Sequence, residues 1–167
     1  MAERPSRRNQ ICESAIVLAA RGGSHALTHQ AIDAELGIAK GSTSYYYRTR
    51  AALIVGVSEF LTAQSRAVFH DLLVRHAGQD PDVVIDAYLA HLAANRRDHV
   101  RARLALALDA DCGAEQRAGL AECLFSLDGA VTLLRSQAHP QPEVGAPDLL
   151  DRLEGHILRN LIFAGSA

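Results

Sequence analysis

Apolar residues recur three or four positions apart along most of the chain, which is the spacing of one face of an α-helix. No segment alternates apolar and polar residues for long, so the pattern predicts no β-strand. Helices are predicted over residues 6–20, 49–76, 81–97, 100–109, 114–137 and 148–163. The clearest predicted loop, residues 139–147, is rich in proline and separates the last two of these helices. The sequence therefore predicts an all-α protein.

A more specific pattern occupies residues 27–53, which read LTHQAIDAELGIAKGSTSYYYRTRAAL. Thr28 is placed to cap a short helix in which Ile32 and Leu36 share one face. A tight turn then leads into a second short helix, predicted over residues 40–46, and a long helix follows it. This order is typical of a helix-turn-helix DNA-binding head.

The second short helix presents small polar side chains and one cation, which suit entry into a major groove. Lys40 and Thr43 are the predicted base readers, and the tyrosine run that contains Tyr46 suits contacts with phosphates. Arg50 adds positive charge at the start of the long helix. The predicted DNA-contacting residues are Arg4, Arg7, Arg8, Thr28, Lys40, Ser42, Thr43, Ser44, Tyr45, Tyr46 and Arg50.

Charge is divided unevenly along the chain, although the net charge of the whole is only −2. Residues 1–50 hold seven cations and four anions, which gives +3, and residues 51–167 hold ten cations and fifteen anions, which gives −5. Arg4, Arg7 and Arg8 form a basic arm that either reaches phosphates or the minor groove, or is a solvated terminus. This asymmetry predicts a DNA-binding domain over residues 1–50, and a helical body over residues 51–167 that does not bind DNA.

Residues 11–53 resemble the DNA-binding head of the TetR family of bacterial transcriptional regulators. The family pattern is roughly T-x-x-x-I-A-x-x-A-G-V-s-x-G-x-x-Y-x-H-F-x-x-K-x-x-L. Matching or nearly matching residues are Thr28, Ile32, Leu36, Gly37, Ile38, Ala39, Gly41, Tyr46, Tyr47 and Leu53. Arg50 falls at the family's phosphate-binding lysine. Asp33 stands in place of an alanine, and Ser44 stands in place of a tyrosine whose phosphate contact Tyr45 is placed to take over.

The resemblance implies a repressor that binds a palindromic operator in double-stranded DNA as a homodimer, and that a small-molecule effector of unknown identity releases. It also implies that residues 114–137 and 148–163 pair with their copies across a two-fold axis. Their apolar stripes are Leu120, Leu124, Leu127, Val131 and Leu134 in the first helix, and Leu149, Leu153, Ile157 and Leu161 in the second. The alternative is that both stripes face the core of a single chain.

The resemblance implies that residues 51–167 form a helical effector-binding and dimerisation domain, and it places the effector among the middle helices. Candidate ligand-contacting residues are aromatic side chains, or polar ones on otherwise apolar helices: Phe60, Tyr88, His91, Asn95, Arg103 and Phe125. The alternative function is a helical small-molecule-binding or scaffolding dimer that does not bind DNA.

No sequence feature predicts an enzyme, a cofactor or a metal site. Cys12, Cys112 and Cys123 have no C-x-x-C spacing, and the histidines lack the spacing of metal ligands. Asp109 and Asp111 are expected to be solvated in a loop. No apolar run reaches the ~18 residues of a membrane span, and the N-terminus does not read as a signal peptide. The protein is therefore expected in the cytoplasm, with no membrane partner.

Overall fold

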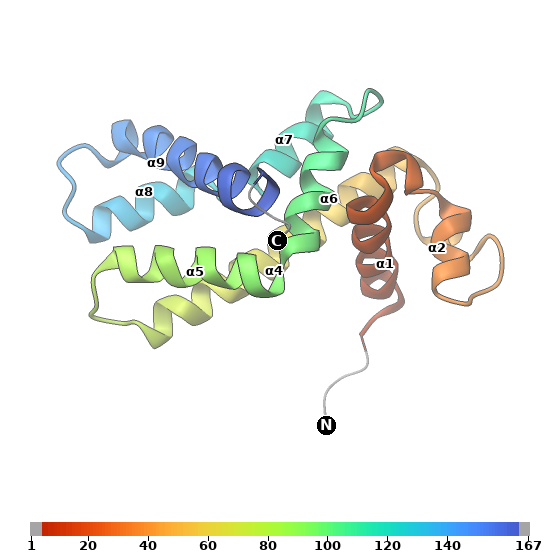
Figure 1. Cartoon of the computed structure of the whole chain (residues 1–167), viewed down its shortest axis with the longest axis horizontal. Helices are drawn as coiled ribbons and strands as arrows, with labels where there is room; N and C mark the ends of the chain where they lie inside the picture. Colours follow the sequence, from red (N-terminus) through yellow and green to blue (C-terminus); the bar gives the residue numbers. More distant parts are fainter. Residues whose placement is uncertain (1–4, 164–167) are drawn as a thin grey trace. The chain divides into compact units, whose positions relative to one another are not determined.

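The computed structural model describes residues 5–163, and these residues form helices and connecting turns only, which confirms the predicted all-α class (Figure 1). The elements are α1 (Arg7–Gly22), η1 (Ser24–Ala26), α2 (His29–Glu35), α3 (Ser42–Tyr46), α4 (Arg50–Arg75), α5 (Pro81–Asn95), α6 (Arg97–Ala107), α7 (Ala114–Glu122), α8 (Leu127–Ser136), α9 (Pro142–Ile157) and η2 (Leu158–Phe163). The last is π-helical and continues α9. Among these described helices, none combines the length and the apolar character that crossing a membrane requires.

Internal packing divides the chain into two compact units. The head unit contains the described residues up to Thr62 together with Asp98–Leu120. The hairpin unit contains Ala63–Arg97 together with the described residues from Ala121 onward. Helix α4 runs through both. The predicted boundary after residue 50 concerns DNA binding rather than packing, so it stays a prediction.

The head unit buries one face of α1 against the helix-turn-helix and the start of α4. Ser6 and Thr28 cap α1 and α2, because their hydroxyls accept the backbone N–H groups of Asn9 and Ala31. Fully buried side chains in this core are Ile11, Ile16, Leu27, Ile32, Leu53, Ile54, Val57 and Leu61. Leu53, Val57 and Leu61 are spaced four residues apart and therefore lie on one face of α4.

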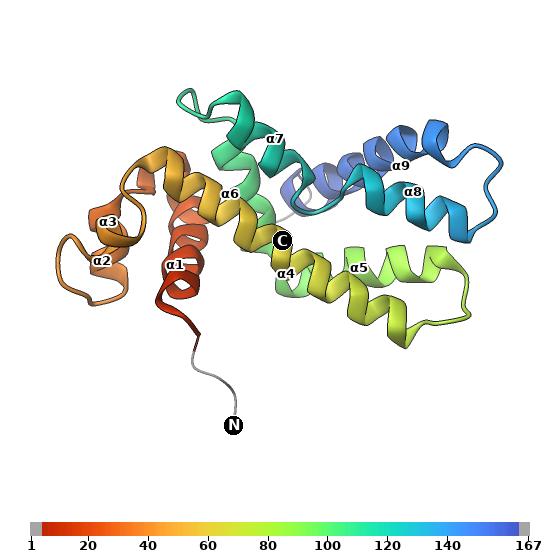
Figure 2. The same ribbon diagram turned by 180° about the vertical axis from the view of Figure 1, so that it is seen from behind.

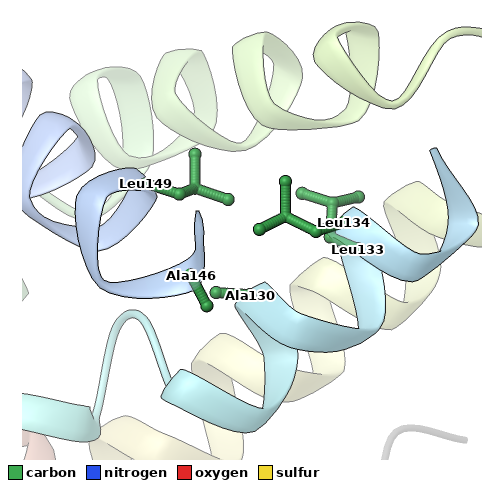
Figure 3. Close-up of a cluster of buried hydrophobic side chains, with 5 residues drawn as sticks. All are labelled: Ala130, Leu133, Leu134, Ala146 and Leu149. Atoms are coloured by element: carbon green, nitrogen blue, oxygen red, sulfur yellow. The ribbon is translucent and has the colours of Figure 1, made fainter. Parts of the chain in front are cut away.

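The hairpin unit consists of two helical hairpins, the end of α4 with α5, and α8 with α9 (Figures 1 and 2). Figure 3 shows the cluster that α8 and α9 bury between them, with Leu133 and Leu134 on α8 and Leu149 on α9. Ala130 and Ala146 lie in the same cluster, where their small side chains let the two helices approach closely. Ile85 of α5 packs against it.

The long helix predicted over residues 114–137 is wrong, because the structure has two helices there, α7 and α8. The intervening turn ends at Ser126, whose hydroxyl accepts the backbone N–H of Gly129 at 3.1 Å and so starts a new helix. Apolar spacing continues across the turn and hides it from the sequence pattern.

The loop predicted over residues 139–147 is also mostly wrong. Helix α9 begins at Pro142, not at residue 148 as predicted, and Pro147 lies inside it. Proline is tolerated in the first turn of a helix because the backbone N–H that it lacks has no intrahelical partner there. Pro142 therefore marks the start of a helix and not a loop.

The apolar stripes predicted for a dimer interface lie mostly in the core of the single chain. The buried members are Leu120, Leu124, Leu134, Leu149, Ile157 and Leu161. Val131 and Leu153 are partly buried, and Leu127 is exposed. The stripes therefore give no support to dimerisation, which stays a prediction from the resemblance.

Candidate functional site

Asp33 holds the two short helices of the helix-turn-helix together. Its buried carboxylate accepts the backbone N–H groups of Gly41 at 2.7 Å and Thr43 at 2.8 Å, and the Thr43 hydroxyl at 2.6 Å. Gly41 precedes α3 with a φ of 92°, which favours glycine, and it has no side chain with which to cap the helix. Burial raises the pKa of Asp33, but the hydrogen bonds from Thr43 and Gly41 outweigh it, and the pKa lies below its usual value. Asp33 thus caps α3 from the neighbouring helix.

Thr43 is fully buried, and its hydroxyl is bonded to Asp33. This placement argues against the prediction that Thr43 reads bases, because a base edge is reached only from the exposed face of α3. Five residues of helix are too few for periodicity to distinguish the buried face from the exposed one, so the sequence did not reveal the difference.

The exposed face of α3 and the turn before it carry other predicted DNA contacts. Tyr45 is 83% exposed, Lys40 and Ser44 are exposed, and Ser42 and Tyr46 are half-buried. The rings of Tyr45 and Tyr46 meet edge to face with their centroids 5.3 Å apart. This surface therefore combines a cation, hydroxyls and two aromatic rings.

Tyr47 anchors the end of α3 inside the head unit. Its hydroxyl lies 3.4 Å from Cys12 Sγ on α1, and its ring lies against Gly56 of α4, at which an added Cβ would overlap the ring. Burial, followed by the contact with Cys12, raises the pKa of Tyr47 to about 12. His29 Nε2 lies 2.7 Å from the Tyr47 carbonyl oxygen, so the tautomer with a proton on Nε2 donates to it.

The predicted basic arm is only partly described, because Arg4 lies outside the described residues. Arg7 and Arg8 are exposed in the first turn of α1. The Arg8 guanidinium lies 5.2 Å from the centroid of the Tyr47 ring and 6.0 Å from that of Tyr46, within the range of a cation–π interaction. Arg8 is therefore held beside the end of α3.

Arg50, predicted to contact phosphate, forms an ion pair inside the head unit. Its Nη1 and Nη2 lie 3.2 Å and 2.7 Å from the two carboxylate oxygens of Asp109, and Nη2 donates to the Ser24 carbonyl oxygen at 2.8 Å. The Arg50 guanidinium holds the pKa of Asp109 well below its usual range. Because the Asp109 side chain is only 4% exposed, the expectation that it is solvated is wrong. Arg50 also retains few donors for a phosphate.

A cavity of about 470 Å³ lies within the hairpin unit, in the size range of small-molecule sites. Tyr88 forms part of its wall, and the Tyr88 hydroxyl donates to the Leu124 carbonyl oxygen at 3.0 Å. The Tyr88 ring meets Phe69 and Phe125 edge to face, with centroids 5.4 Å and 5.8 Å apart. Leu133 and Leu149, both labelled in Figure 3, belong to the wall as well.

Of the six residues predicted to contact a ligand, Tyr88 and Phe125 line this cavity. Phe60 and Arg103 belong to the head unit. His91 and Asn95 lie 3.4 Å apart, side chain to side chain, and neither lines the cavity. The other wall residues cannot be distinguished in the sequence, because an apolar side chain that faces a cavity has the same local pattern as one in a filled core. Within residues 5–163, no three His, Cys, Asp or Glu side chains come together in a group that would hold a metal ion.

Comparison with solved structures finds this arrangement of helices elsewhere. A member of the TetR family from Streptomyces coelicolor A3 matches with a TM-score of 0.72 at 25% sequence identity, over 96% of this chain and 90% of that chain. The protein has the TetR-family fold. The sequence resemblance covers residues 11–53, whereas the similarity in fold covers nearly the whole chain.

Two structures of a further protein with the TetR fold are also similar. The multidrug binding protein EbrR in complex with malachite green matches with a TM-score of 0.70 at 23% identity, over 95% of this chain and 88% of that chain. EbrR in complex with imidazole matches with a TM-score of 0.66 at 24% identity, over 98% and 88%. No family model matches the sequence, and neither does any curated protein.

Proposed function

We propose that this protein is a sequence-specific DNA-binding transcriptional regulator whose binding a small molecule controls. The observation that carries the proposal is the exposed face of α3, which ends a helix-turn-helix that the buried Asp33 holds in place. The TetR fold supports it, since that fold is found in ligand-binding regulators. The positive charge of residues 1–50 supports it further.

In this proposal, α3 enters a major groove. Lys40, Ser42, Ser44 and Tyr45 contact base edges or the neighbouring phosphates, because their side chains lie on or near the exposed face. Contacts with phosphates come from Arg7, Arg8, Thr28 and Tyr46. Thr43 is left out because it is buried, and Arg50 is left out because Asp109 engages its guanidinium.

We propose that the protein acts as a homodimer in the cytoplasm. Two copies of α3 about one turn of DNA apart would read an inverted repeat. Support comes from the TetR fold and from Val144 on α9, an apolar side chain outside the predicted stripes that the single chain leaves exposed.

The proposed effector site is the cavity of the hairpin unit. A ligand there releases DNA if it binds more tightly to the conformation that does not fit the operator. Helix α4 connects the two sites along the chain, because only three residues separate it from the end of α3 and its later turns line the cavity. That EbrR has been seen with malachite green supports a ligand-binding role for the TetR fold.

The test is a selection of bound duplexes from random and genomic DNA with purified protein at moderate salt. We expect an inverted repeat, and we expect Lys40→Ala to change the preferred bases. Arg152→Ala, which removes an exposed cation on α9, serves as the control and should select the wild-type site. A folded protein that selects no sequence would contradict the regulator and favour a second candidate, a helical small-molecule binder without DNA, because the cavity requires no DNA-binding surface.

A further inference from the structure

We propose that the cavity of the hairpin unit takes an uncharged, largely apolar aromatic molecule, with any polar group of the ligand left at the cavity edge. The inference rests on the proposed function in treating this cavity as the effector site. The binding step itself requires no DNA and is measured separately.

The buried part of the cavity wall carries no charged side chain. The buried lining residues are Tyr88, Cys123, Leu124, Ala130, Leu133 and Leu149. The hydroxyl of Tyr88 already donates to the Leu124 carbonyl oxygen. A charged group among these side chains would lose its hydration without gaining an opposite charge, which is strongly unfavourable. The enclosed part of the ligand is therefore uncharged.

Charged side chains line the cavity only where they are exposed, and they carry both signs. Arg66 lies on α4, whereas Glu122 ends α7 and Asp128 lies in the first turn of α8. Water and salt screen exposed charges, and mixed signs give little preference for a cation or an anion. This edge therefore tolerates a polar group but does not select the sign of its charge.

An aromatic wall favours a ligand that contains a ring. Phe69, Tyr88 and Phe125 come from α4, α5 and the turn before α8, and their edge-to-face contacts fix the rings against one another. Ring-to-ring contacts of a bound aromatic molecule with these side chains add to the stabilisation from apolar burial. Leu133 and Leu149, in the cluster of Figure 3, give the ligand an aliphatic surface as well.

Two fluorescent probes that share one aromatic body test the preference for an uncharged ligand. N-phenyl-1-naphthylamine is neutral, and 8-anilino-1-naphthalenesulfonate adds a sulfonate to the same rings; malachite green supplies an aromatic cation. We expect the neutral probe to bind the full-length protein one to one, and at least about tenfold more tightly than the sulfonate or malachite green. Equal or tighter binding of either charged probe would overturn the proposal.

A matched pair of variants tests the site. Leu153 and Val131 are both partly buried against the α8–α9 cluster, but only Leu153 lines the cavity. Leu153→Trp, which fills space in the cavity, should weaken the neutral probe about tenfold, whereas Val131→Trp should change its affinity less than about twofold. Equal loss in both variants, or in neither, would place the probe elsewhere and overturn the proposal. If Leu153→Trp does not fold, Leu150→Trp fills the same cavity from the next turn of α9.

The two proposals fail separately. If the neutral probe binds in the cavity but no duplex is selected, the ligand class stands and the regulator does not. If a duplex is selected and the cavity prefers a charged probe, the regulator stands and the ligand class is overturned.

Discussion

Asp33 and Asp109 are buried carboxylates that stabilise the head unit with different donors. Asp33 is bonded by the backbone and hydroxyl of the neighbouring short helix, and Asp109 by the Arg50 guanidinium. Both have pKa values below the usual range. Neither role could be predicted from the sequence, because the local sequence does not distinguish an Asp that accepts buried hydrogen bonds from a solvated one.

Asp33→Asn is expected to lower the free energy of unfolding by about 2 kcal/mol. The amide oxygen replaces only one carboxylate oxygen, and the new NH₂ group would face the N–H group of either Gly41 or Thr43, a donor against a donor. Urea unfolding measures the change. Glu35→Gln, on the same helix but exposed, is the control and should alter stability by less than about 0.5 kcal/mol.

The pH dependence of this variant has a definite sign. Because the folded-state pKa of Asp33 is lowered, its stabilisation is fully present above the ordinary pKa of about 3.9 and is lost as the pH falls through the folded-state value. The wild type should therefore lose more stability than Asp33→Asn as the pH is lowered through this range. Parallel acid-unfolding curves for the two proteins would show that the carboxylate is not the stabilising group.

Contacts between helices depend on side-chain volume that spacing alone does not reveal. Gly56 looks like a weak point in α4, since glycine lowers helix stability, but the Tyr47 ring occupies the space that a Cβ would need. Apolar spacing likewise continues across the break between α7 and α8, where α7 ends at Glu122 and a cap at Ser126 starts a new helix. A cap or a close contact involves only one or two residues, so it does not change the spacing of apolar residues along a helix.

Gly56→Ala and Gly155→Ala are expected to change stability in opposite directions. Both glycines lie inside helices, but a Cβ at Gly56 would overlap the Tyr47 ring and one at Gly155 meets nothing within 4 Å. Gly56→Ala should destabilise the protein by about 1–3 kcal/mol through overpacking, and Gly155→Ala should stabilise it by up to about 1 kcal/mol. Thermal and urea unfolding of both variants provide the comparison. A stabilising Gly56→Ala would mean that the Tyr47 ring is free to move away.

Over the whole chain, residues 1–50, which carry the proposed DNA-binding surface, have a net positive charge, and residues 51–167 have a net negative charge. A protein of net charge −2 that binds DNA must present its cations locally. Arg8 is suited to this, because it is exposed and held beside Tyr46 and Tyr47. Arg50 is not, because Asp109 engages its guanidinium.

Arg8→Ala is therefore expected to reduce the slope of log affinity against log salt by about one for the selected duplex, whereas Arg50→Ala should leave the slope unchanged. Titrations at several salt concentrations measure both slopes, with Arg152→Ala as a control for the loss of a cation elsewhere. If only Arg50→Ala reduced the slope, Arg50 would be the residue that contacts DNA, and Arg8 would not contact it.

The amino-acid pattern was sufficient for the all-α class and the helix-turn-helix, because capping and three-to-four spacing act between residues close in the chain. The fold was needed to show that Thr43 is buried, that Arg50 meets a carboxylate 59 positions away, and that Phe69, Tyr88 and Phe125 share one cavity. The contact of Thr43 joins two consecutive helices, and the other contacts join helices distant in sequence. Which side chains meet there depends on packing geometry and burial, and neither is encoded in the period of any single helix.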